Sequence, residues 1–298
     1  MILHKSVLLQ EAIFYLDVKP NHNYIDATLG GGGHTEAMLE QNGPRGKVVA
    51  FELDDRTMRN TRAKLARFSS RLIIMRQNFR NIAMISRLRI PFSGILYDLG
   101  LSTDLIKKSG RGFSFLQNEP LDMRFSVSQR LDARQIVNSY SQTDLAKVIR
   151  EYGEERFALS IARHICETRK RKPILTSGDL VEVIEKAVPG RYRHGRIHCA
   201  TRTFQALRIV VNDELEGLKK SLLSAVDILG PDSRVVVISF HSLEDRIVKH
   251  YFRQLKIEGR AEILTKKPIT ASKEECEKNP NARSAKLRAI QCLPSIKT

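Results

Sequence analysis

The chain has 298 residues, of which 42% are hydrophobic, so it can bury one large core or two modest cores without disulfide support. Its 50 Lys and Arg residues exceed its 33 Asp and Glu residues, and the formal charge of +17 favours a polyanion such as nucleic acid as partner, although a generally basic, solvated surface gives the same sum. The 4 cysteines lie far apart without a C-x-x-C pair, which predicts neither a disulfide framework nor a zinc site, even though His198 adjoins Cys199.

The N-terminal segment does not read as a signal peptide, because Glu11 and Asp17 interrupt its apolar residues and no small-residue cleavage site follows. Apolar runs throughout the sequence fall short of the roughly 18 residues that a transmembrane helix needs. We therefore expect a cytoplasmic protein without a membrane partner. The sequence leaves the oligomeric state open, a homodimer included.

Short β-branched runs alternate with helical patterns from Asn23 onward, which is typical of an α/β fold with a mostly parallel sheet. The predicted strands are Tyr24–Ala27, Lys47–Leu53, Leu72–Met75, Gly94–Leu99 and Arg234–Phe240. Later apolar runs around Ile263 and at Leu287–Leu293 predict a closing antiparallel hairpin.

The interval between Gly100 and Arg234 is far longer than the dozen or so residues that a crossover needs, so it predicts an insertion. Apolar residues at steps of three and four indicate helices throughout it. The last of these stripes, from Phe204 to Leu229, predicts one long helix or a pair broken near Asn212 and Asp213.

Two domains follow from this organisation. We expect residues 1–104 and 213–298 to form one domain, and residues 105–212 to form an inserted all-helical domain.

A glycine-rich loop, Gly30 to Gly33, follows the first predicted strand. Glycines allow positive φ and close approach of a ligand, and the next helix supplies free N–H donors, although a glycine run alone also fits an ordinary mobile loop. Glu52 ends the second strand 22 residues after Gly30, where a carboxylate can accept hydrogen bonds from ribose hydroxyls. Asp98 ends the fourth strand at the same sheet edge. The pattern predicts a nucleoside-like ligand, either NAD or S-adenosylmethionine.

Eight long segments resemble the RsmH/MraW family and cover nearly the whole chain. They are His4–Leu9, Asp26–His34, Arg111–Phe115, Pro120–Arg124, Tyr152–Arg156, Thr203–Ile209, Phe240–Arg246 and Ala282–Arg288. The resemblance implies a bacterial enzyme that uses S-adenosylmethionine to methylate N4 of a specific cytidine in 16S (small-subunit) ribosomal RNA, within the assembled small subunit. It also implies a class I, Rossmann-like methyltransferase fold interrupted by a helical substrate-recognition domain.

By motif position, the resemblance implies seven cofactor contacts: Gly32, Gly33, His34, Glu52, Phe79, Asp98 and Leu105. Three positions depart from the family pattern. Glu52 stands where Asp is usual, Leu105 stands where Gln is common, and Cys199 stands where the family has proline in a His-Pro-Ala-Thr segment.

The exocyclic amine of cytosine is a poor nucleophile, so the enzyme must align it with the methyl donor and accept its proton. Methylation at C5 would need a thiolate, usually from a Pro-Cys pair, and none of the cysteines follows a proline. The predicted catalytic residues are Asp98, Ser102, His241, Glu244 and Asp245. The alternative for the last segment is a capped helix start, with a capping box of Ser242 and Asp245.

Basic clusters on the insertion and near the C-terminus predict phosphate contacts. They are Arg169–Lys172, Arg191–Arg196, and Arg283 with Lys286 and Arg288. The residues alone leave three rival functions open: an NAD-dependent oxidoreductase, a non-catalytic RNA-binding ribosome assembly factor, and methylation of DNA or protein.

Overall fold

The structure is a computed structural model that describes residues 6–100, 109–195 and 197–294. Two predicted site residues, Ser102 and Leu105, lie outside these ranges, as does Arg196 of one basic cluster. The chain forms two compact units, residues 1–102 with 215–298 and residues 103–214. A helix long and apolar enough to cross a membrane does not occur in the described ranges.

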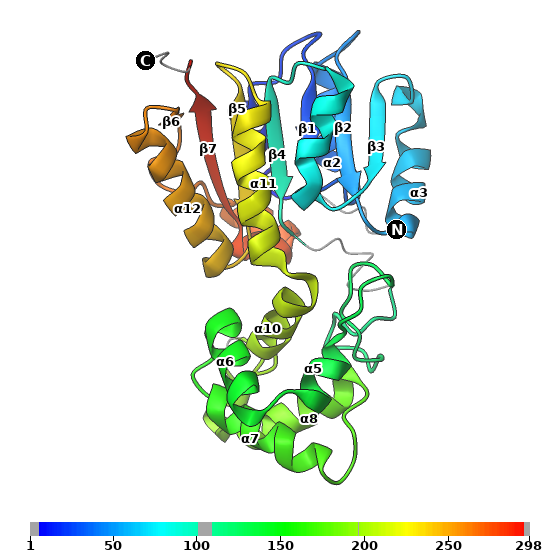
Figure 1. The fold of residues 1–298 in the computed structure, drawn as a ribbon, viewed down its shortest axis with the longest axis vertical. Helices are drawn as coiled ribbons and strands as arrows, with labels where there is room; N and C mark the ends of the chain where they lie inside the picture. Colours follow the sequence, from blue (N-terminus) through cyan, green and yellow to red (C-terminus); the bar gives the residue numbers. More distant parts are fainter. Residues whose placement is uncertain (1–5, 101–108, 196, 295–298) are drawn as a thin grey trace. The chain divides into compact units, whose positions relative to one another are not determined.

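The first unit contains a seven-stranded sheet in the order β3-β2-β1-β4-β5-β7-β6 (Figure 1). The strands are β1 (Tyr24–Asp26), β2 (Val48–Glu52), β3 (Leu72–Arg76), β4 (Gly94–Asp98), β5 (Arg234–Ser239), β6 (Ala261–Ile263) and β7 (Lys286–Cys292). The first five pair in parallel, whereas β7 runs antiparallel between β5 and β6. The predicted α/β class and the five predicted strands are confirmed to within one or two residues at each end.

Each central strand is apolar on both faces because successive side chains enter different cores. Ile25, Val49, Ile95 and Val235 belong to one core cluster. Their neighbours Tyr24, Val48, Leu96 and Val236 belong to the other. The near-continuous apolar runs in the sequence therefore reflect a sheet that is covered on both sides.

Helices supply the other half of each core. The helices and 3₁₀ turns of this unit are α1 (Leu9–Leu16), α2 (Gly33–Gln41), α3 (Asp55–Lys64), η1 (Ala66–Phe68), η2 (Phe79–Leu88), α11 (Glu214–Ile228), α12 (Ser242–Ile257), α13 (Lys273–Lys278) and η3 (Pro280–Ser284). Residues of η2, α11 and α12 pack in one cluster, and residues of α1 and α2 pack in the other. Figure 1 shows α11 and α12 on the same side of the sheet. Because α13 and η3 lie between β6 and β7, this antiparallel pair is joined by a long connection and not by a tight hairpin.

The second unit is built from short helices. They are α5 (Ala133–Ser139), α6 (Gln142–Gly153), α7 (Ala158–Arg169), α8 (Ser177–Ala187), α9 (Gly190–Arg193) and α10 (Thr201–Asn212). Asp213 adopts a left-handed conformation with φ of 49°, so α10 ends there before α11 begins. The predicted break near Asn212 and Asp213 is confirmed.

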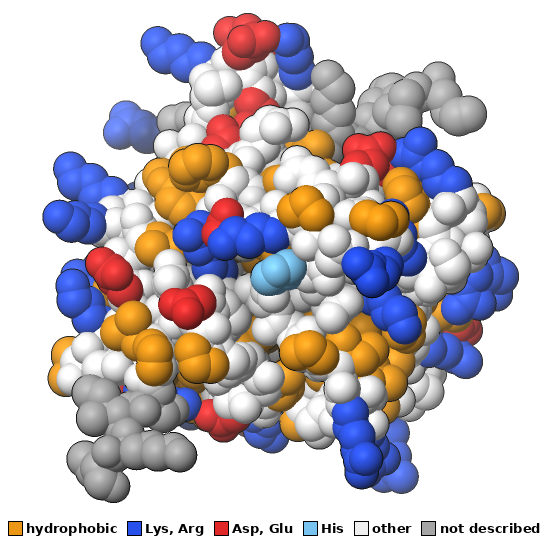
Figure 2. Space-filling view, turned by 90° about the horizontal axis from the view of Figure 1, so that it is seen from above, with side chains coloured by type: hydrophobic (Ala, Val, Ile, Leu, Met, Phe, Trp, Pro, Cys, Tyr) orange, Lys and Arg blue, Asp and Glu red, His pale blue; other side chains and the backbone are white. Residues whose placement is uncertain are grey.

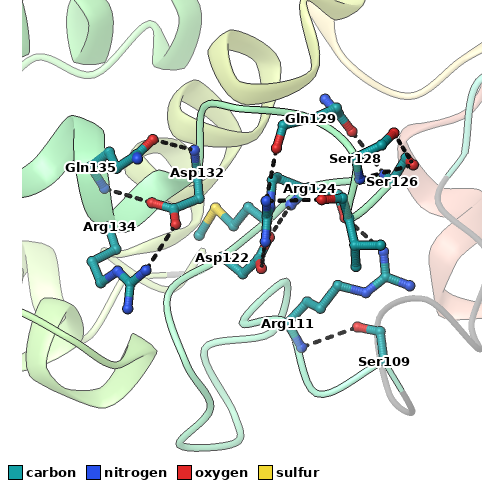
Figure 3. A network of polar contacts seen from close by, with 12 residues as sticks. Ser109, Arg111, Asp122, Arg124, Ser126, Ser128, Gln129, Asp132, Arg134 and Gln135 are labelled. Atoms are coloured by element: carbon teal, nitrogen blue, oxygen red, sulfur yellow. Dashed lines mark hydrogen bonds and ion pairs between the residues drawn. The ribbon is translucent and has the colours of Figure 1, made fainter.

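The expectation of helices throughout this region is wrong for residues 109–132, which form turns and irregular chain. Two arginine side chains stabilise this irregular chain in place of helical hydrogen bonds (Figure 3). Arg111 donates to the carbonyl groups of Arg124 and Phe125 at 2.8 and 2.9 Å. Arg124 binds Asp122 through two nitrogens, each at 2.8 Å, and also donates to the Gln129 carbonyl. These contacts explain why two family-like segments of the sequence lie in a region without hydrophobic periodicity.

Replacing Arg124 by Lys tests this network. The variant keeps the charge but loses the planar fork, so it cannot hold Asp122 through two nitrogens and the nearby carbonyl groups together. We expect the free energy of unfolding, measured with urea, to fall by about 1 to 3 kcal/mol. Arg130→Lys, at an exposed position in the same segment, is the control and should match the parent. Equal stability of both variants would show that the network contributes nothing.

Candidate functional site

A buried carboxylate organises the end of β1. Asp26 is 1% exposed and accepts the Thr35 hydroxyl at 2.6 Å and the Thr28 amide at 3.0 Å. Burial raises the pKa of Asp26 above its ordinary value although the Thr35 contact opposes this. The Thr28 hydroxyl in turn accepts the Asp98 amide at 2.7 Å. The ends of β1 and β4 and the start of α2 are thereby fixed to one another.

The glycine-rich loop turns sharply between β1 and α2. Gly30 and Gly32 have φ of 46° and 74°, as the sequence predicts for a loop that needs positive φ. A Cβ atom on Gly32 would lie 2.5 Å from the Thr61 side chain of α3, and one on Gly33 would lie 2.1 Å from the Ser6 hydroxyl. A side chain added at either position would therefore force its neighbours in the protein to move.

Glu52 closes the other side of the loop by turning back on the main chain. Its carboxylate accepts the amides of Gly30, Leu53 and Asp54 at 3.2, 2.8 and 2.9 Å. A carboxylate offers about four acceptor positions, so one position, on Oε2, is left for a ligand hydroxyl among the contacts described. Burial raises the pKa of Glu52 to about 7.

Asp98, at the same edge, is also partly reachable, with its side chain 18% exposed. His34, the second residue of α2, places Nδ1 3.5 Å from Oδ2 of Asp98 and Nε2 3.1 Å from the Val7 carbonyl. Because His34 is only 5% exposed, it positions Asp98 and the N-terminal segment and offers little surface to a ligand.

Phe79 begins η2 at the same edge and is half-buried. Its ring meets Tyr97 edge to face, with centroids 5.9 Å apart, and its carbonyl accepts the Ser221 hydroxyl at 2.9 Å. The Ser221 and Tyr97 hydroxyl oxygens lie 2.8 Å apart. Phe79 is therefore a rigid aromatic wall, suited to lie against a flat ring.

The loop after β5 lies next to the end of β4. The Leu99 amide donates to the Ile238 carbonyl at 3.0 Å, and the Phe240 ring covers Gly100, where a Cβ would lie 2.8 Å from the ring. His241 follows Phe240 and caps α12. The structure therefore brings the predicted residues Asp98 and His241 to neighbouring loops.

The predicted capping box of Ser242 and Asp245 is wrong by one residue. The box consists of His241 and Glu244: the Glu244 amide donates to Nδ1 of His241, and Oε2 of Glu244 accepts the His241 amide. Glu244 also accepts the Phe240 amide at 2.8 Å and is 3% exposed. Glu244 thus holds the start of α12 in place.

Asp245 forms an ion pair with Arg288 of β7, with Nε to Oδ1 at 2.6 Å. Burial alone would raise the pKa of Asp245, but the Arg288 guanidinium holds it below its ordinary value. Arg288 is 9% exposed, so its predicted role as a phosphate contact is wrong. Arg169 is likewise occupied, because it donates to the Val137 and Tyr140 carbonyl groups, each at 2.6 Å.

Six members of the predicted basic clusters are exposed within the described ranges. Exposed members are Lys170, Arg171, Lys172, Arg191, Arg193 and Arg283. Positive charge is not confined to them, since Figure 2 shows Lys and Arg side chains around a whole face, with acidic and hydrophobic side chains between them. On this face, positive charge is therefore spread widely and is not gathered in one patch.

The sequence reasoning missed the hydroxyls of Thr28 and Thr35 and the buried Asp26. The signal was present, because Asp26 opens the glycine motif and the two threonines lie inside or just after it. Short-range contacts of this kind depend on the turn geometry, which the motif does not state.

A mostly parallel sheet in the order β3-β2-β1-β4-β5-β7-β6 with an antiparallel β7, a glycine loop after β1 and acidic residues at the ends of β2 and β4 is the class I, Rossmann-like methyltransferase fold. The model of the MraW methylase family matches residues 1–293, and the chain belongs to this family. A curated relative, "Ribosomal RNA small subunit methyltransferase H" of Sulfurihydrogenibium sp. (strain YO3AOP1), is 43% identical over 290 residues, which are 97% of this chain and 98% of the relative. The protein is a methyltransferase, which confirms the family resemblance. The alternatives of an NAD-dependent oxidoreductase and a non-catalytic assembly factor are not supported.

Two solved structures are also similar to this chain, at lower sequence identity. A putative rRNA-methylase from Clostridium thermocellum has a TM-score of 0.47 and 12% identity, and the match covers 97% of this chain and 99% of that chain. A putative methyltransferase from Streptococcus mutans in complex with SAH has a TM-score of 0.44 and 11% identity, with 98% and 100% covered.

Replacing Asp245 by Asn leaves Arg288 buried without its partner, so the free energy of unfolding near neutral pH should fall by about 3 kcal/mol. The lowered pKa of Asp245 means that the pair stabilises the parent above the ordinary Asp pKa of about 3.9, and that this contribution is lost as the pH falls through the lowered value. The free energies of unfolding of parent and variant, measured with urea, should therefore converge as the pH falls from neutral to acid. Asp227→Asn, which removes an exposed partner of Arg260, is the control. A difference in free energy of unfolding that stays constant at all pH values would contradict the assigned role of the Asp245–Arg288 ion pair.

Proposed function

We propose that the protein transfers the methyl group of S-adenosylmethionine to N4 of a cytidine in small-subunit ribosomal RNA. The observation that carries the proposal is Asp98, whose amide donates to Thr28 and whose partly exposed carboxylate lies next to His34 beside the glycine loop. Family membership and the name of the 43% identical relative support the reaction and the RNA class.

The residues at the edge fit such a cofactor. Glu52 keeps one acceptor position for a ribose hydroxyl, and Phe79 offers a fixed ring. The loop is open to a ligand at Gly31, which is exposed, and at Gly33, which is half-buried, whereas Gly32 is buried; His34 acts through Asp98. When bound, the cofactor supplies a methyl group activated on a sulfonium centre.

Asp98 performs the chemistry that the amine needs. Its carboxylate accepts a hydrogen bond from the exocyclic N–H, which fixes the lone-pair direction and draws electron density toward nitrogen. The same oxygen takes the proton as the nitrogen gains its methyl group. His241, on the neighbouring loop, contacts the target base, while Glu244 and Asp245 hold the loop.

The second unit recognises the RNA in this proposal. Residues 105–212 carry the exposed basic residues Lys170, Arg171, Lys172, Arg191 and Arg193, which follow phosphates without reading sequence. We place the reaction in the cytoplasm, on the assembled small subunit, with the target base unstacked to reach Asp98.

Transfer of labelled methyl from S-adenosylmethionine to small ribosomal subunits that lack the modification tests the reaction and Asp98 together. We expect N4-methylcytidine in the nucleoside analysis for the parent. At saturating cofactor, Asp98→Asn should turn over at least ~10²-fold more slowly than the parent, because an amide cannot take the proton. Asp55→Asn, which removes an exposed partner of Arg76, should match the parent.

Free ribosomal RNA and duplex DNA are the substrate controls. Labelled DNA, a different nucleoside product, or full turnover by Asp98→Asn would each contradict the proposal.

Glu52 predicts a pH dependence of cofactor binding. Its pKa of about 7 means that its carboxylate, the stronger acceptor for a ribose hydroxyl, becomes populated as the pH rises through about 7. Affinity for S-adenosylmethionine, measured by calorimetry, should rise over that interval in the parent and in Glu40→Gln, an exposed control. Glu52→Gln should bind more weakly and without this rise. If the affinity of Glu52→Gln for S-adenosylmethionine rises with pH in the same way, another titrating group causes the rise.

A further inference from the structure

Three different metal-ligand side chains meet in the second unit, and none of them is assigned to methyl transfer. Glu185 lies on α8, and His198 and Cys199 lie just before α10. One ligand atom of each lies within 4.8 Å of the others. A spread of this size lets one small cation contact all three after modest side-chain rotation, since zinc binds these atom types at about 2.0 to 2.3 Å.

The two residues before α10 are held in place by the fold. The His198 ring stacks on Phe115 with centroids 4.6 Å apart and planes at 12°. Its Nδ1 accepts the Ala200 amide at 3.2 Å, so a cation bound at Nδ1 would replace this hydrogen bond. Cys199 is 2% exposed, so its thiol points into the unit. Because these side chains already have little freedom, cation binding costs less side-chain conformational entropy.

Charge complementarity favours a divalent cation. A thiolate and a carboxylate supply two negative charges, and a neutral imidazole supplies the third donor. Burial and the nearby Glu185 carboxylate raise the pKa of the Cys199 thiol above its ordinary value, and Arg193 opposes this. A bound cation would relieve the repulsion between the Glu185 carboxylate and the Cys199 thiolate.

We infer that Glu185, His198 and Cys199 form a zinc-binding site. Zinc is the cation of choice because thiolate, imidazole and carboxylate together match its preferences, whereas magnesium and calcium prefer oxygen alone. On binding, the Cys199 thiol proton passes to solvent as the zinc–sulfur bond forms. Water completes the tetrahedral shell.

The site ties α8 to the start of α10 across the segment of residues 188–200. That segment carries Arg191 and Arg193, so a bound zinc ion fixes both ends of the chain that presents them. Sequence spacing alone hides the site because Glu185 belongs to a helix before this segment. The inference stands independently of the reaction and substrate proposed above.

Cobalt reports thiolate coordination directly, because it replaces zinc and gives thiolate-to-metal charge-transfer absorption together with the visible bands of a tetrahedral centre. The full chain, stripped with a chelator, is titrated with cobalt chloride and then with zinc chloride. We expect one cobalt per chain with both absorptions, and zinc should bleach them by displacement. Absence of charge-transfer absorption in the stripped, folded parent would overturn the inference.

Matched variants assign the ligands. Cys199→Ser should lose the charge-transfer absorption, and Glu185→Gln should weaken cobalt binding at least tenfold. Cys166→Ser, a half-buried cysteine of α7, and Glu182→Gln, an exposed residue of α8, should behave as the parent.

Thermal unfolding provides a second readout. Zinc should raise the unfolding midpoint of the parent and of both control variants, but not that of Cys199→Ser or Glu185→Gln, and circular dichroism verifies that each variant is folded. If Cys199→Ser does not fold, the loss of affinity in Glu185→Gln and its retention in Glu182→Gln decide the matter. Retained charge-transfer absorption in folded Cys199→Ser, or unchanged affinity in Glu185→Gln, would overturn the inference.

Discussion

The buried Asp26 carboxylate is the contact on which the methyltransferase site depends. It holds Thr28 and Thr35, and Thr28 holds the Asp98 amide, so one side chain links two strands and a helix. An unpaired carboxylate at this depth would be costly, and its hydrogen bonds make the arrangement tolerable. The position of Asp98 at the end of β4 thus depends on a buried carboxylate at the end of β1, which is three strands earlier in sequence but its neighbour in the sheet.

The strands could be predicted because a doubly covered sheet needs apolar residues on both faces, and such runs are visible without coordinates. The irregular chain of residues 109–132 could not. Arg111 and Arg124 stabilise it by donating to carbonyl groups, and this mode of support leaves no hydrophobic period. The capping box was displaced by one residue because His241 serves as a cap in place of Ser242.

The site was predictable in part. Glu52 and Asp98 stand at strand ends, where the fold class places polar groups, so their position follows from topology. The pairing of Asp245 with Arg288 joins residues from α12 and β7, and the meeting of Glu185 with Cys199 joins a helix to a distant loop. Contacts of this range depend on how elements pack, which a single sequence does not specify.

The position of β7 between β5 and β6 has a consequence for synthesis of the chain. β5 emerges from the ribosome before β7, and until residues 286–292 arrive its outer hydrogen-bonding edge has no partner strand on that side. Such an edge is a template for pairing with other chains. A nascent chain paused within this interval is thus most exposed to misassembly, and rapid completion of translation is itself a means of protecting the sheet.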